Sequence, residues 1–317
     1  MSETSDKSTL EYQLVSSLLS EQRSTRRWKN ARFFIWLTLF LAFVFLFLIP
    51  LMSDKDSNNG SGNSNYVSLI RLNGVIMPNN PFSAAKVLPE LTSAFKDTHS
   101  KGVVLLINSP GGSPVQAGII HDKILQLKAK YHKQAIVVAE DTLASGAYLV
   151  ATAADKIYVN KDTVTGSIGV IMEGFGFSDV MKKVGISRRV FTAGAHKDRM
   201  DPFEPINPED RVKIDSILTA VHTDFINDVL EGRKGKLNGD PKELFSGDFW
   251  TGSQAVHLGL ADATANIWEA MQETFKTNHY RDYSPHPGLW ESIMKDVSME
   301  MQFGGSQQSL HLQEIAR

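Results

Sequence analysis

The sequence predicts an α/β protein, because short apolar runs typical of strands alternate along the chain with segments of helical periodicity. Helices are expected around residues 84–95, after Pro114, after Ser145 and, as a long amphipathic helix, over residues 209–230. After residue 267 the pattern weakens. We therefore expect one domain over residues 66–267 and a loosely packed carboxy-terminal tail over residues 268–317. The strand-like runs are VSLIRLNGVI (67–76), VVLLIN (103–108), AIVVAE (135–140), KIYV (156–159) and SIGVIM (167–172).

Composition argues against several classes of function. The 33 basic and 35 acidic residues nearly cancel and form no basic tract outside the amino-terminal segment, so no nucleic-acid partner is expected. The chain has no cysteine, which excludes thiol catalysis, cysteine-bound zinc and disulfide bonds. Its nine histidines form no HExxH motif. We therefore expect neither a metal nor a cofactor.

A strongly apolar run near the amino terminus predicts one transmembrane helix over residues 33–52. Between Phe33 and Ile49 only Thr38 is polar, and the run nearly spans a bilayer at about 1.5 Å per residue. The alternative of a buried helix is weak, because a run this apolar on every face leaves no side for water. A cleaved secretory signal is also disfavoured, since the run exceeds the roughly 7–15 residues of a signal core and no small-x-small cleavage site follows.

The charges on either side of this run predict its orientation. Residues 23–32 carry five basic side chains, whereas Asp54, Lys55 and Asp56 follow the run. By the positive-inside rule, residues 1–32 form a cytoplasmic tail and the large domain lies outside the cytoplasm. Residues 53–65, SDKDSNNGSGNSN, contain no core-forming side chain and are expected to form a flexible linker.

Ser145 is a candidate nucleophile. It lies between a strand-like run that ends in polar residues and a helix of small residues, in AEDTLASGAYLVATAAD. This position would aim its hydroxyl outward at a helix amino terminus, where free backbone N–H groups favour a developing oxyanion. The alternative is an ordinary helix N-cap, a common role of serine. The local pattern leaves both interpretations open.

Two adjacent glycines, Gly111 and Gly112, follow the run VVLLI in the segment NSPGGS. Adjacent glycines after a strand let the backbone turn sharply and approach a ligand closely, so that their N–H groups could donate to a carbonyl oxygen. An ordinary turn is the alternative. No phosphate-loop lysine follows at the required spacing, so a nucleotide site is not supported.

Lys197, in TAGAHKDRMDPFEP, is a candidate general base. A lysine works as a base near neutral pH only if burial and a hydroxyl partner lower its pKa from about 10.4 to roughly 7–8, and most lysines are simply solvated. His196 is a rival base, but adjacent side chains usually point in different directions. Ser167, in TVTGSIGVIM, could hydrogen-bond the lysine or merely close a turn.

Taken together, these segments resemble a known family. The segments NSPGGS, LASGAYLVATAADKIYVN, TGSIGVIM, GAHKDRMDPF and LFSGDFWTGSQAVHLGLAD match, in this order and spacing, the bacterial signal peptide peptidase A family of serine/lysine-dyad proteases. The resemblance covers about residues 67–262 and is to the short form, with one serine and one lysine per chain. One departure is His196, where many relatives have tyrosine. The resemblance implies a fold like that of ClpP and crotonase, built from repeated β-β-α units.

The resemblance also implies roles for individual residues. Ser145 would be the nucleophile, Lys197 the general base and Ser167 the residue that orients the lysine. The oxyanion hole would lie in the region of Gly111, Gly112 and Gly146, without a decision on which amides donate. The implied reaction is hydrolysis of peptide bonds through an acyl-enzyme, with backbone amides stabilising the tetrahedral oxyanion.

Location, partners and substrates are further expectations from the resemblance. The protein would lie in the bacterial inner membrane, contact the lipid bilayer through residues 33–52, and cleave remnant signal peptides and other membrane-derived fragments outside the cytoplasm. Double-length relatives draw the lysine from one half and the serine from the other, so this chain is expected to form a homo-oligomeric ring with Lys197 of one subunit reaching Ser145 of the next. Two other interpretations remain: a catalytically inert membrane scaffold, and a crotonase-type acyl-CoA enzyme, which an outward-facing domain disfavours.

Overall fold

The structure is a computed structural model that describes residues 32–43 and 65–285. The chain divides into two compact units, Met1–Gly62 and Asn63–Arg317. In the first unit, residues 32–43 are helical, and the remaining residues of the predicted transmembrane helix, 44–52, lie outside the described residues. Within the described ranges, no helix combines the length and the apolar character needed to cross a membrane.

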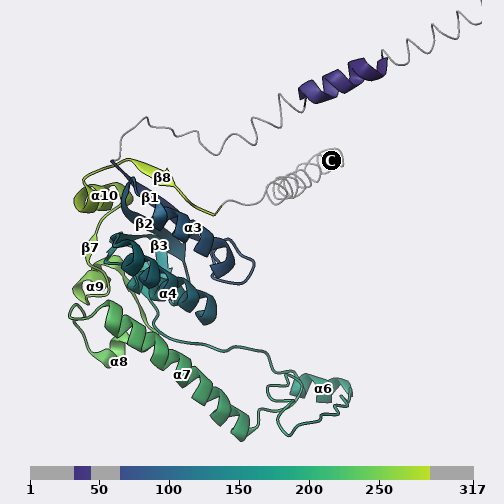
Figure 1. The fold of residues 1–317 in the computed structure, drawn as a ribbon. Coiled ribbons are helices and arrows are strands. Elements are labelled where there is room, and N and C mark those ends of the chain that lie inside the picture. The colour runs from purple at the N-terminus through teal and green to yellow at the C-terminus, as the bar shows by residue number, and fades with distance from the viewer. Residues whose placement is uncertain (1–31, 44–64, 286–317) are drawn as a thin grey trace, which may run out of the picture. The chain divides into compact units, whose positions relative to one another are not determined.

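The second unit is built on one eight-stranded sheet with the order β6-β5-β3-β2-β1-β8, to which β4 and β7 are joined through β3. Figure 1 labels β8, β1, β2 and β3 within this sheet. All neighbouring strands are parallel except β5 and β6, which are antiparallel. This architecture confirms the predicted α/β class. The strands are β1 (Tyr66–Asn73), β2 (Ser100–Ser109), β3 (Ala135–Ala144), β4 (Lys156–Val159), β5 (Val164–Gly166), β6 (Phe249–Thr251), β7 (Ala263–Thr264) and β8 (Tyr280–Asp282).

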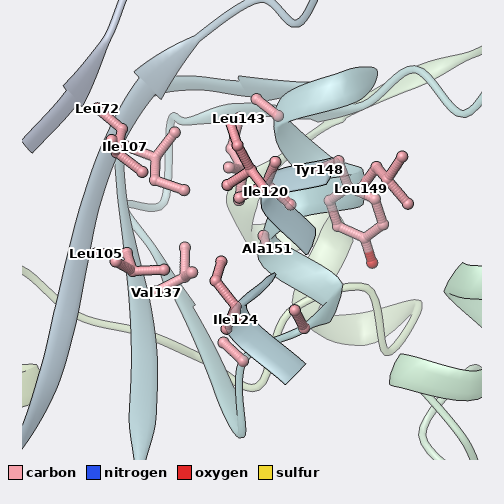
Figure 2. Close-up of a cluster of buried hydrophobic side chains, with 14 of the residues drawn as sticks. Leu72, Leu105, Ile107, Ile120, Ile124, Val137, Leu143, Tyr148, Leu149 and Ala151 are labelled. Atoms are coloured by element: carbon pink, nitrogen blue, oxygen red, sulfur yellow. The ribbon is translucent and has the colours of Figure 1, made fainter. Parts of the chain in front are cut away.

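The described part of this unit has eight helices. They are α3 (Ala84–Lys96), α4 (Pro114–Tyr131), α5 (Gly146–Thr152), α6 (Ser178–Val184), α7 (Pro208–Gly232), α8 (Pro241–Leu244), α9 (Gly252–His257) and α10 (Ile267–Phe275). Of these, α4 and α5 pack on one face of the sheet and α10 on the other. Alternate strand side chains such as Leu105 and Val137 pack with α4 and α5, as Figure 2 shows, while their neighbours Val104 and Ile136 pack with α10. Two-sided burial explains why β2 and the first half of β3 are almost continuously apolar.

A second, smaller set of backbone pairings lies beyond the ends of the first strands. Ile76 donates its N–H to Gly111 O at 2.8 Å and accepts from Ser113 N–H at 2.7 Å. The last residue of β2, Ser109, pairs with Leu143 of β3, and the end of β3 pairs with β5. Short backbone pairings thus continue beyond β1, at Ile76 and Gly112, and at the ends of β2 and β3.

The prediction of a strand over SIGVIM is wrong. The strand in this region is β5, which ends at Gly166, immediately before the predicted one. Gly166 and Ser167 have φ angles of 94° and 49°, outside the extended region, so the chain turns out of the sheet here. Ile171, in the middle of the predicted strand, is 82% exposed.

The structure also differs from the prediction at residues 268–285, which were expected in a loosely packed tail. α10 begins at a capping box formed by Asn266 and Glu269, and it buries Ala270, Met271 and Phe275. β8 then pairs in parallel with β1. Nine- and three-residue elements carry too few apolar repeats for periodicity to reveal them.

A buried ion pair fastens the residues after α7 to the sheet. Arg233, which is 1% exposed, donates to Gly259 O through Nε at 2.9 Å and to Asp262 Oδ2 through Nη1 at 2.6 Å. Asp262 also accepts from Lys236 Nζ at 2.7 Å and from Ile157 N–H at 2.8 Å. Burial opposes ionisation of Asp262, but these donors outweigh it and hold its pKa below the ordinary 3.8.

We predict that Asp262→Ala lowers the free energy of unfolding by about 3–5 kcal/mol, because it leaves the Arg233 guanidinium buried without its counter-charge. Urea unfolding at neutral pH measures this. Asp179→Ala, which removes the exposed partner of Lys182, is the matched control and should cost at most about 0.5 kcal/mol. Because the folded-state pKa of Asp262 is lowered, its contribution is full above 3.8 and is lost as the pH falls below that value. Equal losses in the two variants would contradict the prediction.

Candidate active site

Ser145 forms the turn between β3 and α5. Its backbone has a φ of 52° and a ψ of −126°, a conformation that a residue with a side chain adopts only under constraint from its surroundings. Its side chain makes no capping hydrogen bond, so the geometry does not support the alternative of an ordinary N-cap. The Ser145 N–H donates to Gly166 O at 2.8 Å, which holds the turn against the end of β5.

The helix that follows Ser145 is fixed in the core. All seven residues of α5 are buried. The Tyr148 hydroxyl donates to Leu260 O at 2.8 Å, and burial raises the pKa of this hydroxyl. At the end of α5, Thr152 O lies 2.4 Å from the point where a Cβ on Gly232 would stand, so α7 packs directly against it. Ser145 is therefore mounted on a rigid element.

The three glycines named from the sequence lie beside Ser145. A Cβ added to Gly111 would stand 2.7 Å from the Cβ of Ser145 and 2.8 Å from the N atom of Gly146. A Cβ added to Gly146 would stand 3.5 Å from the N atom of Gly112. The turn at residues 111–112 and the start of α5 are thus in direct backbone contact.

Hydrogen bonding distinguishes among these glycines. The Gly111 N–H donates to Ser109 Oγ at 3.1 Å, so it is already used. Ile76 bonds to Gly111 O and to Ser113 N–H, and not to the N–H of Gly112 between them. Gly146 is the first residue of α5, where an N–H has no acceptor within the helix. Among the hydrogen bonds of residues 65–285, the N–H groups of Gly112 and Gly146 have no acceptor.

Ser167 lies next to this group of residues. It follows Gly166, which pairs with Ala144 and accepts from Ser145. The Ser167 N–H donates to Asp248 O at 2.7 Å, and its φ is 49°. The structure therefore brings Ser145, Ser167 and the three glycines together from three separate segments of the chain.

Lys197 is not brought to Ser145 within one chain. It lies in residues 169–207, here called the arm, which leaves the sheet after β5 and returns through α7. Arg199 Nε is 2.8 Å from Asp210 Oδ1 in the first turn of α7, whereas His222 of α7 contacts Ile168 beside the site. The twelve residues from Asp210 to His222 correspond to about 18 Å along the helix. Figure 1 shows α6 and its loops beyond the amino-terminal end of α7.

The arm folds mainly on itself. Phe177 N–H donates to Pro202 O at 2.5 Å, the rings of Phe177 and Phe203 are 5.7 Å apart, and Arg188 forms an ion pair with Asp201. Lys197 is exposed, as is His196. The long helix predicted over residues 209–230 is confirmed as α7, but only Phe225 and Val229 are buried in it. Exposed apolar side chains of the arm are Ile171, Met172, Phe175, Phe177, Val180, Val184, Ile186, Val190, Phe191, Met200, Phe203 and Ile206.

Two contacts with the site were not anticipated from the sequence. Asp248, whose carbonyl holds Ser167, lies in LFSGDFWTGSQAVHLGLAD, one of the segments that carry the family resemblance. His222 Nε2 donates to Ile168 O at 3.0 Å, and no local signal distinguishes this histidine from the other residues of an amphipathic helix. In the described part of the chain, no group of three or more His, Asp or Glu side chains could hold a metal ion.

Comparison with known proteins gives one family and several relatives. The model of peptidase family S49 matches residues 128–280, which include Ser145, Ser167 and Lys197. The chain is 31% identical over 239 residues to an Enterococcus faecium protein named as a provisional signal peptide peptidase SppA, covering 73% of this chain and 69% of that protein. It is 31% identical over 214 residues to protease 4 of Haemophilus influenzae, covering 66% of this chain and 32% of that protein.

Another relative is far longer than the part that matches. A Brucella melitensis protein named Na(+)/H(+) antiporter NhaA is 41% identical over 214 residues, covering 66% of this chain but only 29% of that protein. The chain thus matches less than a third of that relative. Among solved structures, a mutant of the 1510-N membrane-bound stomatin-specific protease is similar with a TM-score of 0.47 and 15% identity, covering 70% of this chain and 99% of that one.

We predict that Gly112→Ala lowers the free energy of unfolding by about 1–3 kcal/mol, because its φ is 145° and a Cβ would stand 2.2 Å from Ile76 O. The matched control is Gly118→Ala in α4, where a Cβ meets nothing within 4 Å. That variant should gain up to about 1 kcal/mol from helix propensity. Urea unfolding measures the free energy of unfolding of both variants. A Gly112→Ala protein as stable as the wild type would refute the prediction.

Proposed function

Because the chain belongs to peptidase family S49, we propose that it is a serine endopeptidase in which Ser145 is the nucleophile and Lys197 of a neighbouring subunit is the general base. The observation that carries the proposal is the environment of Ser145. It lies in a strained turn before a buried helix, its side chain makes no capping bond, and two neighbouring backbone N–H groups have no acceptor among the described residues. Such a group suits acyl transfer, which needs an accessible hydroxyl and donors for the oxyanion.

In the proposed reaction, neutral Lys197 takes the proton of the Ser145 hydroxyl as its oxygen attacks the peptide carbonyl. The N–H groups of Gly112 and Gly146 stabilise the oxyanion of the tetrahedral intermediate, and the Ser167 hydroxyl orients the lysine. Protonated Lys197 then gives its proton to the leaving amine, which leaves an acyl-enzyme. Water, deprotonated by the same lysine, hydrolyses the ester and restores the Ser145 hydroxyl.

The position of the arm supports a lysine supplied by another subunit. Lys197 and Ser145 lie towards opposite ends of α7 in one chain, and the Lys197 side chain is exposed. The arm also exposes many large apolar side chains, Phe191 at 94% among them, which a second copy of the chain would cover. A head-to-tail contact of this kind closes into a ring when the rotation between subunits allows it.

The remaining parts of the proposal concern fold type, location and substrates. A ClpP- and crotonase-like arrangement fits the short pairings that follow β1 and β2. A transmembrane helix over residues 33–52 would hold the peptidase domain at the outer face of the bacterial inner membrane. At that location, remnant signal peptides and other fragments released from the membrane would be its substrates.

The dyad is tested by single and mixed variants. Ser145→Ala and Lys197→Ala should each lower peptide hydrolysis at least about 1000-fold, with losses far from additive in the double variant because the two groups act as one unit. His196→Ala, the matched control from the neighbouring residue, should retain activity. When the two inactive chains are co-expressed, about a quarter of the interfaces pair an intact serine with an intact lysine, so activity should partly return.

Three results would contradict this scheme. A mixture as inactive as either parent, despite co-purification of differently tagged chains, would mean that each chain builds its own dyad. Loss of activity in His196→Ala with retention in Lys197→Ala would make the histidine the base. A wild-type protein that no fluorophosphonate probe labels at Ser145 would favour the inert scaffold.

The membrane anchor is tested in intact cells. We predict that the full-length chain stays with the membrane after a high-salt wash, and that protease added outside spheroplasts degrades the large domain but spares the segment before Phe33. A variant with Leu39→Arg and Leu41→Arg should partition less into the membrane, since each arginine costs about 2.5–3.5 kcal/mol at the centre of a spanning helix. Recovery of the wild-type chain in the soluble fraction would contradict the anchor.

A further inference from the structure

We propose that His222 is a positioning residue for Ser145, acting through the segment Gly166–Ile168. The imidazole holds this segment by a hydrogen bond from Nε2 to Ile168 O at 3.0 Å. The same segment accepts the backbone N–H of Ser145 and carries Ser167. This inference rests on the proposed role of Ser145 and adds a residue that touches neither the substrate nor the reacting atoms.

The segment needs to be held because its backbone is strained. Gly166 and Ser167 have positive φ angles of 94° and 49°, and the second is unfavourable for a residue with a side chain. The chain after it is tightly confined as well, since a Cβ on Gly169 would stand 2.9 Å from the Cα of Gly247. A conformation of this kind persists only where the surrounding structure enforces it.

Three hydrogen bonds from three different elements enforce it. Ser145 N–H donates to Gly166 O at 2.8 Å, Ser167 N–H donates to Asp248 O at 2.7 Å, and His222 Nε2 donates to Ile168 O. Of these three bonds, only the one from His222 comes from a side chain. A substitution of His222 therefore removes this bond and leaves the backbone groups of the other two bonds unchanged.

The chemistry of this bond makes His222 a donor. A carbonyl oxygen can only accept, so Nε2 carries a proton. This holds for the neutral tautomer protonated at Nε2 and for the protonated ring. The backbone of His222 is held in place because Phe225 and Val229, within the next two turns of α7, are buried in the core. His222 thus connects a packed part of α7 to the strained turn beside Ser145.

The test uses two amide variants of the full-length chain. His222→Gln places an amide N–H at a reach similar to that of Nε2, whereas His222→Asn is one methylene shorter and falls short of Ile168 O. The rate of Ser145 labelling by a fluorophosphonate probe, and kcat and KM for peptide hydrolysis, are measured together with the midpoint of thermal unfolding. The Gln and Asn variants are matched in polarity and charge, so they differ mainly in reach.

We expect His222→Asn to lower the labelling rate and kcat by about 10- to 100-fold with KM nearly unchanged, because a displacement of about 1 Å at a reacting group costs about 100-fold. His222→Gln should restore both rates to within a fewfold of the wild type. Equal rates in the two variants, whether both fast or both slow, would overturn the inference. Both slow would instead indicate that the imidazole itself transfers a proton or that any substitution disturbs α7.

The outcome is separable from that of the proposed function. If the wild type is not labelled and Ser145→Ala behaves identically, the nucleophile assignment fails and with it the premise of this inference. If the wild type is labelled at Ser145 but His222→Asn reacts equally fast, the proposed function stands and only the role of His222 is refuted.

Discussion

The turn at Ser145 is held by a hydrogen bond from its own N–H to Gly166 O, and most of the site follows from that contact. A φ of 52° at a serine is maintained only because this bond on one side and the buried helix α5 on the other leave no alternative. The close approach of Gly111 to Ser145 then requires a residue without a side chain. β3, the turn at Ser145 and α5 thus fix the position of the Ser145 hydroxyl together.

α7 imposes the second constraint, because a helix is rigid and this one is packed only near one end. Phe225 and Val229 are buried, whereas Val212, near the other end, is 70% exposed. The arm that carries Lys197 is therefore presented away from the core of its own chain. Because the lysine of one chain does not reach the serine of the same chain, the proposed chemistry depends on assembly rather than on the fold of one chain.

Periodicity was most informative where side chains are buried on both faces of a strand, as in β2 and the first half of β3, since such strands can only be apolar. It failed at SIGVIM, because apolar composition carries no information on the positive φ at Ser167 that ends the strand. It also missed α10 and β8, which are too short to show a repeat. The local motifs indicated the glycine pair and Ser145 only as candidates, and their roles were implied by the resemblance of several separated segments to a known family.

The sequence by itself determined the residue types, their order and the segments that carry them, because motifs and apolar repeats are properties of neighbouring residues. Only the tertiary structure decided which of those residues meet. Ser145, Ser167 and the three glycines come together through backbone pairings between distant segments, and Lys197 does not join them in one chain. The reason is geometric. The direction in which the chain leaves β5, and the end at which α7 is packed, both depend on contacts between residues far apart in the sequence, which a local sequence pattern does not contain.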